Sequence, residues 1–256
     1  MLTVQNLSFA YGAIQVLDDI SMGMPEGRIT CILGRNGVGK TTLLMNIMGL
    51  LRPTIGAVYM EDRDLTDLPA DKRAAAGLGL VPQGRRIFPR LTVEENLKVG
   101  LSTLGRRATK IPGEIYDLFP ILKTMGKRMG GDLSGGQQQQ LAIARALVGE
   151  PKVLLLDEPT EGIQPNVIQQ IGAVLERLVK ERGMTIVMVE QYLDFVKEIG
   201  DRFYLMDRRR VVASGLTSDL NSDRAIFLKN CRRFDECRSL VAYESSSEGC
   251  QFGVLR

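Results

Sequence analysis

The spacing of apolar positions changes along the chain, and each change predicts a different kind of element. Residues 2–33 alternate apolar and polar positions in short runs separated by Tyr11-Gly12 and Pro25-Glu26-Gly27, which predicts antiparallel strands and turns. Apolar residues recur at helical spacing over 41–51, directly after a glycine-rich loop. Three shorter elements are expected next: a strand at 56–60, a helix at 69–76 and a buried strand at 79–81.

The character of the chain changes after Gln83. Helical patterns cover 92–101 and 113–124, and no convincing strand occurs until Val153, so about 85–150 is expected to be a helical insert. Alternation then resumes, with strands at 153–156 and 185–189, helices at 165–182 and 192–199, and a hairpin near 203–214. The sequence therefore predicts an α/β core interrupted by a helical subdomain, together forming one domain over 1–220.

The last segment, 221–256, has no clean period. It ends in a serine-rich stretch around Ser245-Ser246-Ser247, a composition typical of mobile tails. Its arginines are interspersed with acids, which favours a solvated tail over a docking surface. We assign it no role.

Composition narrows the possible classes of protein. Hydrophobic residues make up 44% and charged residues 25%, as in ordinary globular domains. A net charge of +3, from 33 basic and 30 acidic residues, is too balanced for a nucleic-acid partner. Apolar runs are far shorter than the roughly 20 residues that span a bilayer, so any membrane role is expected to come through a partner.

The N-terminus lacks the features of a secretory signal, so a cytoplasmic location is expected. The four cysteines, Cys31, Cys231, Cys237 and Cys250, have no zinc-site spacing and are predicted to be free, reduced thiols. The chain contains no histidine, so a carboxylate or water must carry any proton transfer at neutral pH.

The strongest local motif is a phosphate-binding loop between a predicted strand and a predicted helix. Its glycines would let backbone N–H groups surround phosphate oxygens at the positive end of that helix. Lys40 would hold the β and γ phosphates, and the Thr41 hydroxyl would bind Mg²⁺. A flexible glycine-rich turn is the other interpretation, which the flanking strand and helix disfavour. The predicted nucleotide-binding residues here are Gly34, Arg35, Asn36, Gly37, Val38, Gly39, Lys40, Thr41 and Thr42.

Two acids follow the buried strand that begins at Val153. The carboxyl ends of strands are where open α/β sheets bind ligands. Asp157 would reach Mg²⁺, and Glu158 is the candidate to polarise the water that attacks the γ-phosphate. An isolated pair of this kind could equally be two solvated charges, but the upstream phosphate loop favours the catalytic interpretation.

A second anion site is indicated by Leu133-Ser134-Gly135-Gly136-Gln137, which precedes a strongly helical run. Ser134 is placed to cap that helix, and the glycines leave its first N–H groups open. Taken alone, the segment is more typical of a plain cap with a flexible entry. Combined with the other two motifs, it predicts binding of a phosphate through Ser134, Gly135, Gly136 and Gln137.

The three motifs together resemble the ABC ATPase family, with LSGGQ as the diagnostic signature and the resemblance covering residues 1 to about 218. The resemblance implies a P-loop NTPase core with a mixed sheet, an N-terminal antiparallel β subdomain and the helical insert. It implies ATP and Mg²⁺ as cofactors. It also assigns Tyr11 to stacking on adenine, where a core tyrosine is the alternative, and Gln83 to sensing the γ-phosphate and Mg²⁺.

The resemblance also implies partners. In the family, two ATPase subunits pair head to tail, so Ser134–Gln137 of one would cover the ATP bound by the other. Such a pair docks on membrane permease subunits, and an importer adds a substrate-binding protein that the ATPase does not touch directly. The expected location is therefore the inner face of the cell membrane.

Two positions depart from the general family pattern. Gln191 stands where most members carry the switch histidine, and we assign it a role in hydrolysis. Gln164 stands where an aspartate often joins the two subunits. These departures resemble the importers of urea and of branched-chain amino acids. Gln83 favours urea, because branched-chain relatives tend to have glutamate at that position; the branched-chain importer is the alternative.

A function of another class is a non-transport ABC protein, of the translation or DNA-repair type. The single phosphate loop and the lack of a heptad run argue against it. A generic P-loop kinase or GTPase would leave SGGQ as a coincidence. Co-purification would discriminate these alternatives, with a permease in one case and ribosomes in another.

Overall fold

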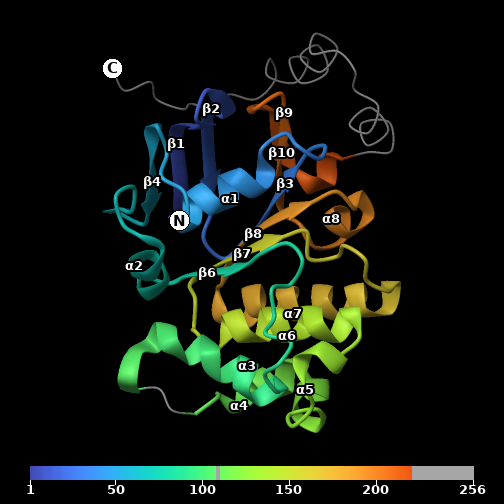
Figure 1. Cartoon of the computed structure of the whole chain (residues 1–256). Helices are drawn as coiled ribbons and strands as arrows, with labels where there is room; N and C mark the ends of the chain where they lie inside the picture. The colour runs from blue at the N-terminus through green and yellow to red at the C-terminus, as the bar shows by residue number, and fades with distance from the viewer. Residues whose placement is uncertain (108–109, 221–256) are drawn as a thin grey trace.

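Two sheets of different character organise residues 1–107 and 110–220, the ranges that this computed structural model describes (Figure 1). The first sheet is antiparallel and has the strand order β2-β1-β4-β5. Its strands are β1 (Leu2–Tyr11), β2 (Ile14–Met24), β4 (Ile55–Met60) and the short β5 (Arg63–Asp64). The expected antiparallel N-terminal subdomain is confirmed, although β5 has no signal in the sequence. The prediction for 221–256 lies outside the described residues.

Within the described residues, the second sheet has six strands in the order β10-β9-β3-β8-β7-β6. Only β10 is antiparallel to its neighbour, so the sheet is mixed, as expected. The strands are β3 (Ile29–Leu33), β6 (Leu78–Val81), β7 (Val153–Asp157), β8 (Thr185–Glu190), β9 (Arg202–Asp207) and β10 (Arg210–Leu216).

One strand prediction is wrong. Residues 29–33 were expected to be antiparallel like the strands before them, but β3 pairs in parallel with β8 and β9. Every residue of β3, β7 and β8 is buried, because both faces of this sheet are covered. A strand buried on both faces reads as a continuous apolar run, so its sequence alone does not reveal its direction.

The two faces of the central strands feed two separate cores. Leu155 and Val187 pack with the antiparallel sheet and helix α1 (Lys40–Met48) in one core. Their neighbours Leu154 and Ile186 face the other core, together with the helices that follow β6. This alternation follows from the two-residue period of a strand. The central strands are thus clamped between two apolar layers, which fixes where their carboxyl ends lie.

The helical part lies away from the antiparallel sheet (Figure 1). Within the expected 85–150 insert, the described residues contain helices and one isolated bridge, between Thr92 and Met129. The single helix expected at 113–124 is divided at Pro120, which begins the second piece. No helix within the described ranges is long and apolar enough to cross a membrane. The remaining helices are α2 (Ala70–Ala75), α3 (Val93–Gly100), η1 (Leu101–Arg107), α4 (Gly113–Leu118), α5 (Pro120–Thr124), η2 (Gly130–Asp132), α6 (Gly135–Leu147), α7 (Pro165–Arg182), α8 (Leu193–Ile199) and η3 (Thr217–Asp219).

A buried arginine anchors the end of α1 that is opposite the phosphate loop. Arg73, on α2, is 1% exposed, and burial lowers its pKa. Its Nη1 donates to the carbonyls of Asn46 and Ile47 at 2.7 Å, and its other nitrogens donate to Leu68 and Thr66 at 2.8 Å. Since the last carbonyls of a helix lack internal partners, Arg73 caps α1 with a cation at its negative end.

Candidate nucleotide site

The glycine-rich loop joins β3 to α1 at the carboxyl edge of the parallel strands. Gly34, Gly37 and Gly39 all have positive φ, and a Cβ on Gly34 would lie 2.5 Å from the carbonyl oxygen of Met206. Only glycine fits that combination of backbone conformation and close approach. A cavity of about 220 Å³ lies beside the loop, and its lining includes Lys40, Thr41, Gln83 and Glu158.

Lys40 is held at the mouth of the loop by the loop itself. Its Nζ donates to the carbonyls of Gly34 at 2.8 Å and Arg35 at 3.0 Å, and it lies 3.7 Å from Oε1 of Glu158. Burial lowers the pKa of Lys40, while the neighbouring carboxylates of Glu158 and Asp157 oppose that change. The lysine is therefore a largely desolvated cation at the phosphate loop, which strengthens its attraction for an anion.

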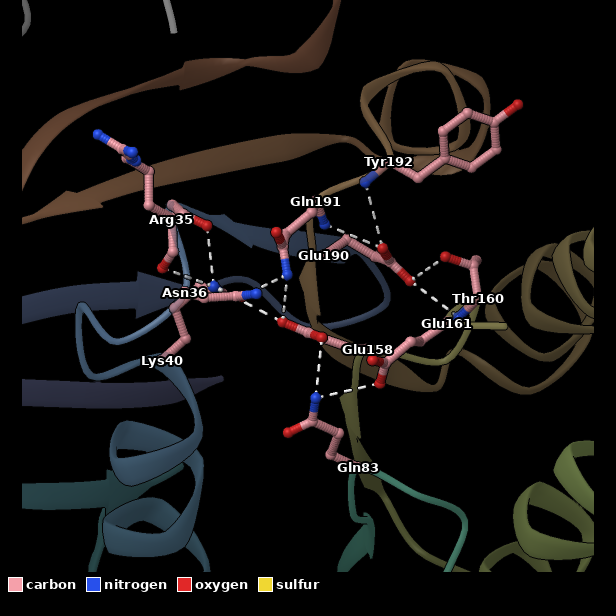
Figure 2. Close-up of polar contacts among 11 residues, drawn as sticks. Arg35, Asn36, Lys40, Gln83, Glu158, Thr160, Glu161, Glu190, Gln191 and Tyr192 are labelled. Atoms are coloured by element: carbon pink, nitrogen blue, oxygen red, sulfur yellow. Dashed lines mark hydrogen bonds and ion pairs between the residues drawn. The ribbon is translucent and has the colours of Figure 1, made fainter. Parts of the chain in front are cut away.

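Two amides hold the carboxylate of Glu158 from opposite sides (Figure 2). Gln191 Nε2 donates to Oε1 at 2.7 Å, and Gln83 Nε2 donates to Oε2 at 3.1 Å. The Gln191 amide also donates to Asn36 Oδ1 at 2.6 Å, which connects it to the phosphate loop. The structure thus brings Glu158, Gln191, Gln83 and the loop together around one point. Both side chains that hold the carboxylate are neutral at every ordinary pH.

Asp157 ends β7 and has the chemistry of a magnesium ligand. Its Oδ1 is buried and has no hydrogen-bond partner among the described residues. Burial raises the pKa of Asp157, and a hydrogen bond from Thr41 offsets part of that rise. A buried, unsatisfied carboxylate oxygen beside a hydroxyl fits a hard cation that takes oxygen ligands. Gln83 presents its amide nitrogen to Glu158 and Glu161, so its oxygen is on the other side of the amide from these acids.

The signature segment forms a capped helix start, as predicted. Ser134 Oγ accepts from Gln137 N at 3.4 Å, and Gln137 Oε1 accepts from Ser134 N at 3.0 Å. Ser134 and Gln137 line a separate groove of about 640 Å³ together with Gln164, and no residue of the phosphate loop lines that groove. The signature segment and the phosphate loop of one chain therefore line separate hollows.

Some residues are placed differently from the sequence interpretation. Tyr11 is 49% exposed at the end of β1 and stacks edge-on against Phe9 at 4.8 Å, but it does not line the loop cavity. Val16 does line that cavity, and no motif pointed to it. Arg85 was also missed: its guanidinium lies about 3.1 Å from where a Cβ on Gly135 would be. Cys31 is free, as expected, and it is buried. The other three cysteines lie outside the described residues.

A strand, a phosphate loop and a helix, with acids at the end of another parallel strand of the same sheet, define a P-loop nucleotide-binding protein. The comparisons with known proteins narrow this class. A family model described as "ABC transporter" matches residues 17–161.

Two curated relatives and one solved cassette match over most of the chain. The branched-chain amino acid transport ATP-binding protein BraG of Pseudomonas aeruginosa is 40% identical, over 83% of this chain and 91% of its own. The probable branched-chain protein LivF of Archaeoglobus fulgidus is 37% identical, over 86% and 94%. The dimeric structure of the bacterial ABC transporter cassette MJ0796 aligns with a TM-score of 0.78 and 28% identity, over 85% and 99%. A second structure of that cassette, with a TM-score of 0.77, is described as a post-hydrolysis state bound to ADP and Pi.

The chain belongs to the ABC transporter family. Its fold is the ATPase cassette fold of that family, and its activity is ATP hydrolysis.

Proposed function

We propose that this chain is the ATP-hydrolysing subunit of an importer for branched-chain amino acids. The observation that carries the proposal is the 40% identity to BraG over 83% of the chain, supported by the match to LivF. Gln83 had favoured urea, but it is one side chain in a subunit that does not touch the cargo. Similarity over most of the chain is stronger evidence than this one side chain, and it favours the branched-chain importer.

The phosphate loop binds the β and γ phosphates of ATP in this proposal. The amides of residues 34–41 and the desolvated ammonium of Lys40 surround the phosphates, with Arg35, Val38 and Thr42 completing the loop and the first turn of α1. Tyr11 stacks its exposed face on adenine. Supporting this placement, the 220 Å³ cavity lies between the loop and Glu158, where a terminal phosphate and an attacking water would meet.

Thr41 and Asp157 would hold Mg²⁺, to which Gln83 would contribute its amide oxygen. The ion supplies neutralisation of the negative charge that develops on the phosphate oxygens. Glu158 accepts a hydrogen bond from the attacking water and polarises it. Gln191 and Gln83 hold the Glu158 carboxylate in place, which preserves the near-attack geometry on which the rate depends.

The functional unit is a head-to-tail pair of ATPase subunits. Ser134, Gly135, Gly136 and Gln137 of one subunit cover the ATP held by Lys40 of the other. This arrangement gives each of the two phosphate-binding elements a partner, although they lie apart within one chain. ATP closes the pair and hydrolysis reopens it, and the motion drives permease subunits in the membrane between two access states. A substrate-binding protein delivers cargo on the far side.

Glu158→Gln tests the catalytic assignment. The variant keeps the shape of the side chain but cannot accept a proton, so we expect ATP to bind with unchanged affinity while turnover falls by about a hundredfold or more. Glu176→Gln, the same chemical change on the exposed part of α7, is the matched control and should turn over normally. Normal turnover by Glu158→Gln would refute the role of Glu158.

The cargo is tested by uptake rather than by ATPase assays. In a strain that lacks this chain, we expect uptake of labelled leucine to be lost, to be restored by the wild-type chain and not to be restored by Glu158→Gln. Loss of urea uptake with leucine uptake intact would identify the urea branch instead. Co-purification from detergent-solubilised membranes should recover a permease; recovery of ribosomes would indicate a non-transport function.

A further inference from the structure

A buried carboxylate with no role so far ends β8. Glu190 is 2% exposed and accepts four hydrogen bonds (Figure 2). Its Oε1 accepts from N and Oγ1 of Thr160 at 3.0 and 2.8 Å. Its Oε2 accepts from the backbone N of Gln191 at 3.0 Å and of Tyr192 at 3.3 Å. The side chain therefore joins the loop after β7 to the loop after β8.

These contacts close a ring that contains the catalytic carboxylate. Thr160 follows Glu158 by two residues, and Gln191 directly follows Glu190. The ring is completed by the Gln191 side chain, which donates back to Glu158 at 2.7 Å. Since Pro159 stiffens the link between Glu158 and Thr160, displacement of any one member is transmitted to the others. The backbone N of Glu158 also donates to Val189 O at 3.0 Å, which fixes a second point of the ring to β8.

The donors around Glu190 select a carboxylate in particular. No lysine or arginine within the described residues forms an ion pair with it, so neutral donors alone satisfy it. Burial raises the pKa of Glu190, and its four hydrogen bonds oppose that rise. Each oxygen of the Glu190 carboxylate accepts from two donors. A glutamine side chain in the same place would replace one oxygen with an NH₂ group, which would then face N–H donors instead of an acceptor. A buried carboxylate of this kind is costly unless it is fully bonded, which makes the geometry of its donors rigid.

We propose that Glu190 is a positioning residue for hydrolysis, which sets the separation of Glu158 and Gln191 through the ring it forms with Thr160. Glu190 does not line the cavity beside the phosphate loop. It fixes the two loops from which the carboxylate and its amide partner project. This proposal rests on the role of Glu158 proposed above.

Two variants weaken the ring in different ways. Glu190→Gln keeps the volume but opposes donor to donor on whichever side its NH₂ group takes, toward Thr160 or toward Gln191 and Tyr192. Thr160→Val keeps the shape and removes only the hydroxyl donor, so it remains informative if Glu190→Gln folds poorly. We expect kcat for ATP to fall by about tenfold or more for Glu190→Gln and by less for Thr160→Val, with KM for ATP within about twofold of wild type. Thr160→Ser, which keeps the donor, should restore kcat.

The decisive measurement is the double variant with Gln191→Ala. If Glu190 acts through Gln191, then Glu190→Gln should cost much less kcat in the Gln191→Ala background than in the wild type. Asp201→Asn is the matched structural control, because Asp201 lies at the amino-terminal ends of β3 and β9, away from the phosphate loop. It accepts from Ile29 N at 2.8 Å and from Arg28 Nη1 at 3.0 Å. It should lower the melting temperature without lowering kcat.

Wild-type kcat in Thr160→Val and Glu190→Gln, or kcat losses that multiply independently with Gln191→Ala, would overturn the proposal. So would a loss of kcat in Asp201→Asn equal to that in Glu190→Gln at the same loss of stability. Failure of this inference is distinct from failure of the proposed function, because the latter would show as normal turnover by Glu158→Gln. Assays use the full-length chain co-expressed with its partner ATPase and permease.

Discussion

Lys40 and Glu158 form a nearly buried ion pair, with Nζ 3.7 Å from Oε1 and side chains 4% and 9% exposed. Glu158 has a φ of 49°, in the left-handed region that a residue with a side chain rarely adopts. Such a conformation costs on the order of 1–3 kcal/mol and persists only where surrounding contacts enforce it. The amides of Gln83 and Gln191 supply that enforcement, so the carboxylate is directed at the phosphate loop by contacts on both sides.

Gln191→His should give hydrolysis a pH dependence that the wild type lacks. The chain has no histidine, and the amides around Glu158 do not titrate, so wild-type kcat should show no step near a pH of about 6.5. In the variant, the adjacent Glu158 carboxylate raises the pKa of the imidazole, so kcat should change through a step above about pH 6.5. The measurement is kcat from about pH 5.5 to pH 9. A step near neutrality in both proteins would show that another group controls the rate.

As the pH rises, ATP binding should weaken at a lower pH than it would with an exposed lysine in the phosphate loop. Burial lowers the pKa of Lys40, and the ammonium must be charged to attract phosphate, so affinity falls as the pH rises through this lowered value. The loss should therefore begin at a lower pH than for an exposed lysine, whose pKa is about 10.4. Titration with a fluorescent ATP analogue at increasing pH measures it. Lys40→Arg stays charged and should show weaker but pH-independent binding; a parallel decline in both proteins would contradict the assignment.

Arg73→Met should destabilise the fold far more than a surface arginine change. It removes the Arg73 donor from four backbone carbonyls, including that of Ile47 in the last turn of α1; the carbonyl of Asn46 still accepts from Gly49 N at 3.1 Å. We expect the free energy of unfolding to fall by about 3 kcal/mol or more. The control is Arg52→Met, because Arg52 and its partner Asp67 are both 77% exposed, and its loss should stay below about 1 kcal/mol. Urea unfolding of both variants decides; equal losses would mean that the carbonyls find other donors.

Gly136→Ala and Gly135→Ala should differ although they are neighbours in one helix. A Cβ on Gly136 would lie 2.9–3.2 Å from three carbons of Val167 on α7, a rigid β-branched side chain. Overpacking of that kind costs about 1–3 kcal/mol. The three atoms nearest to a Cβ on Gly135 all belong to the guanidinium of Arg85, the far end of a flexible side chain. Because alanine gains about 1 kcal/mol over glycine in a helix, Gly135→Ala should be near neutral in thermal unfolding. A larger loss for Gly135→Ala would contradict this packing argument.

The sequence could predict elements whose physics is local. The phosphate loop is one example, because its glycines, lysine and threonine lie within eight residues and the strand and helix flank them. The Ser134 cap is another, since both of its hydrogen bonds span three residues. Gln164 and Gln191 were identified as unusual from the family pattern, and the structure places Gln191 against Glu158.

Features that depend on distant pairing could not be predicted. Arg73 resembles any other helical arginine until the fold brings it against the end of α1, 26 and 27 residues away. Thr160 and Glu190 are 30 residues apart, and nothing local distinguishes that glutamate from an exposed one. The predicted direction of β3 was wrong for the same reason. Its direction is set by pairing with β8 and β9 and not by the pattern of apolar and polar residues within the strand.

Strands β6 and β7 pair in parallel from Leu78↔Val153 to Val81↔Leu156. The chain between them forms the helical insert, from α3 to α6. It therefore departs at the nucleotide edge of the sheet and re-enters at the opposite edge. Of its two covalent attachments, the departing one lies beside the phosphate loop, and Gln83 follows the end of β6 by two residues. A displacement of these helices would therefore act on Glu158 through the short segment after β6, whose Gln83 amide donates to the Glu158 carboxylate at 3.1 Å.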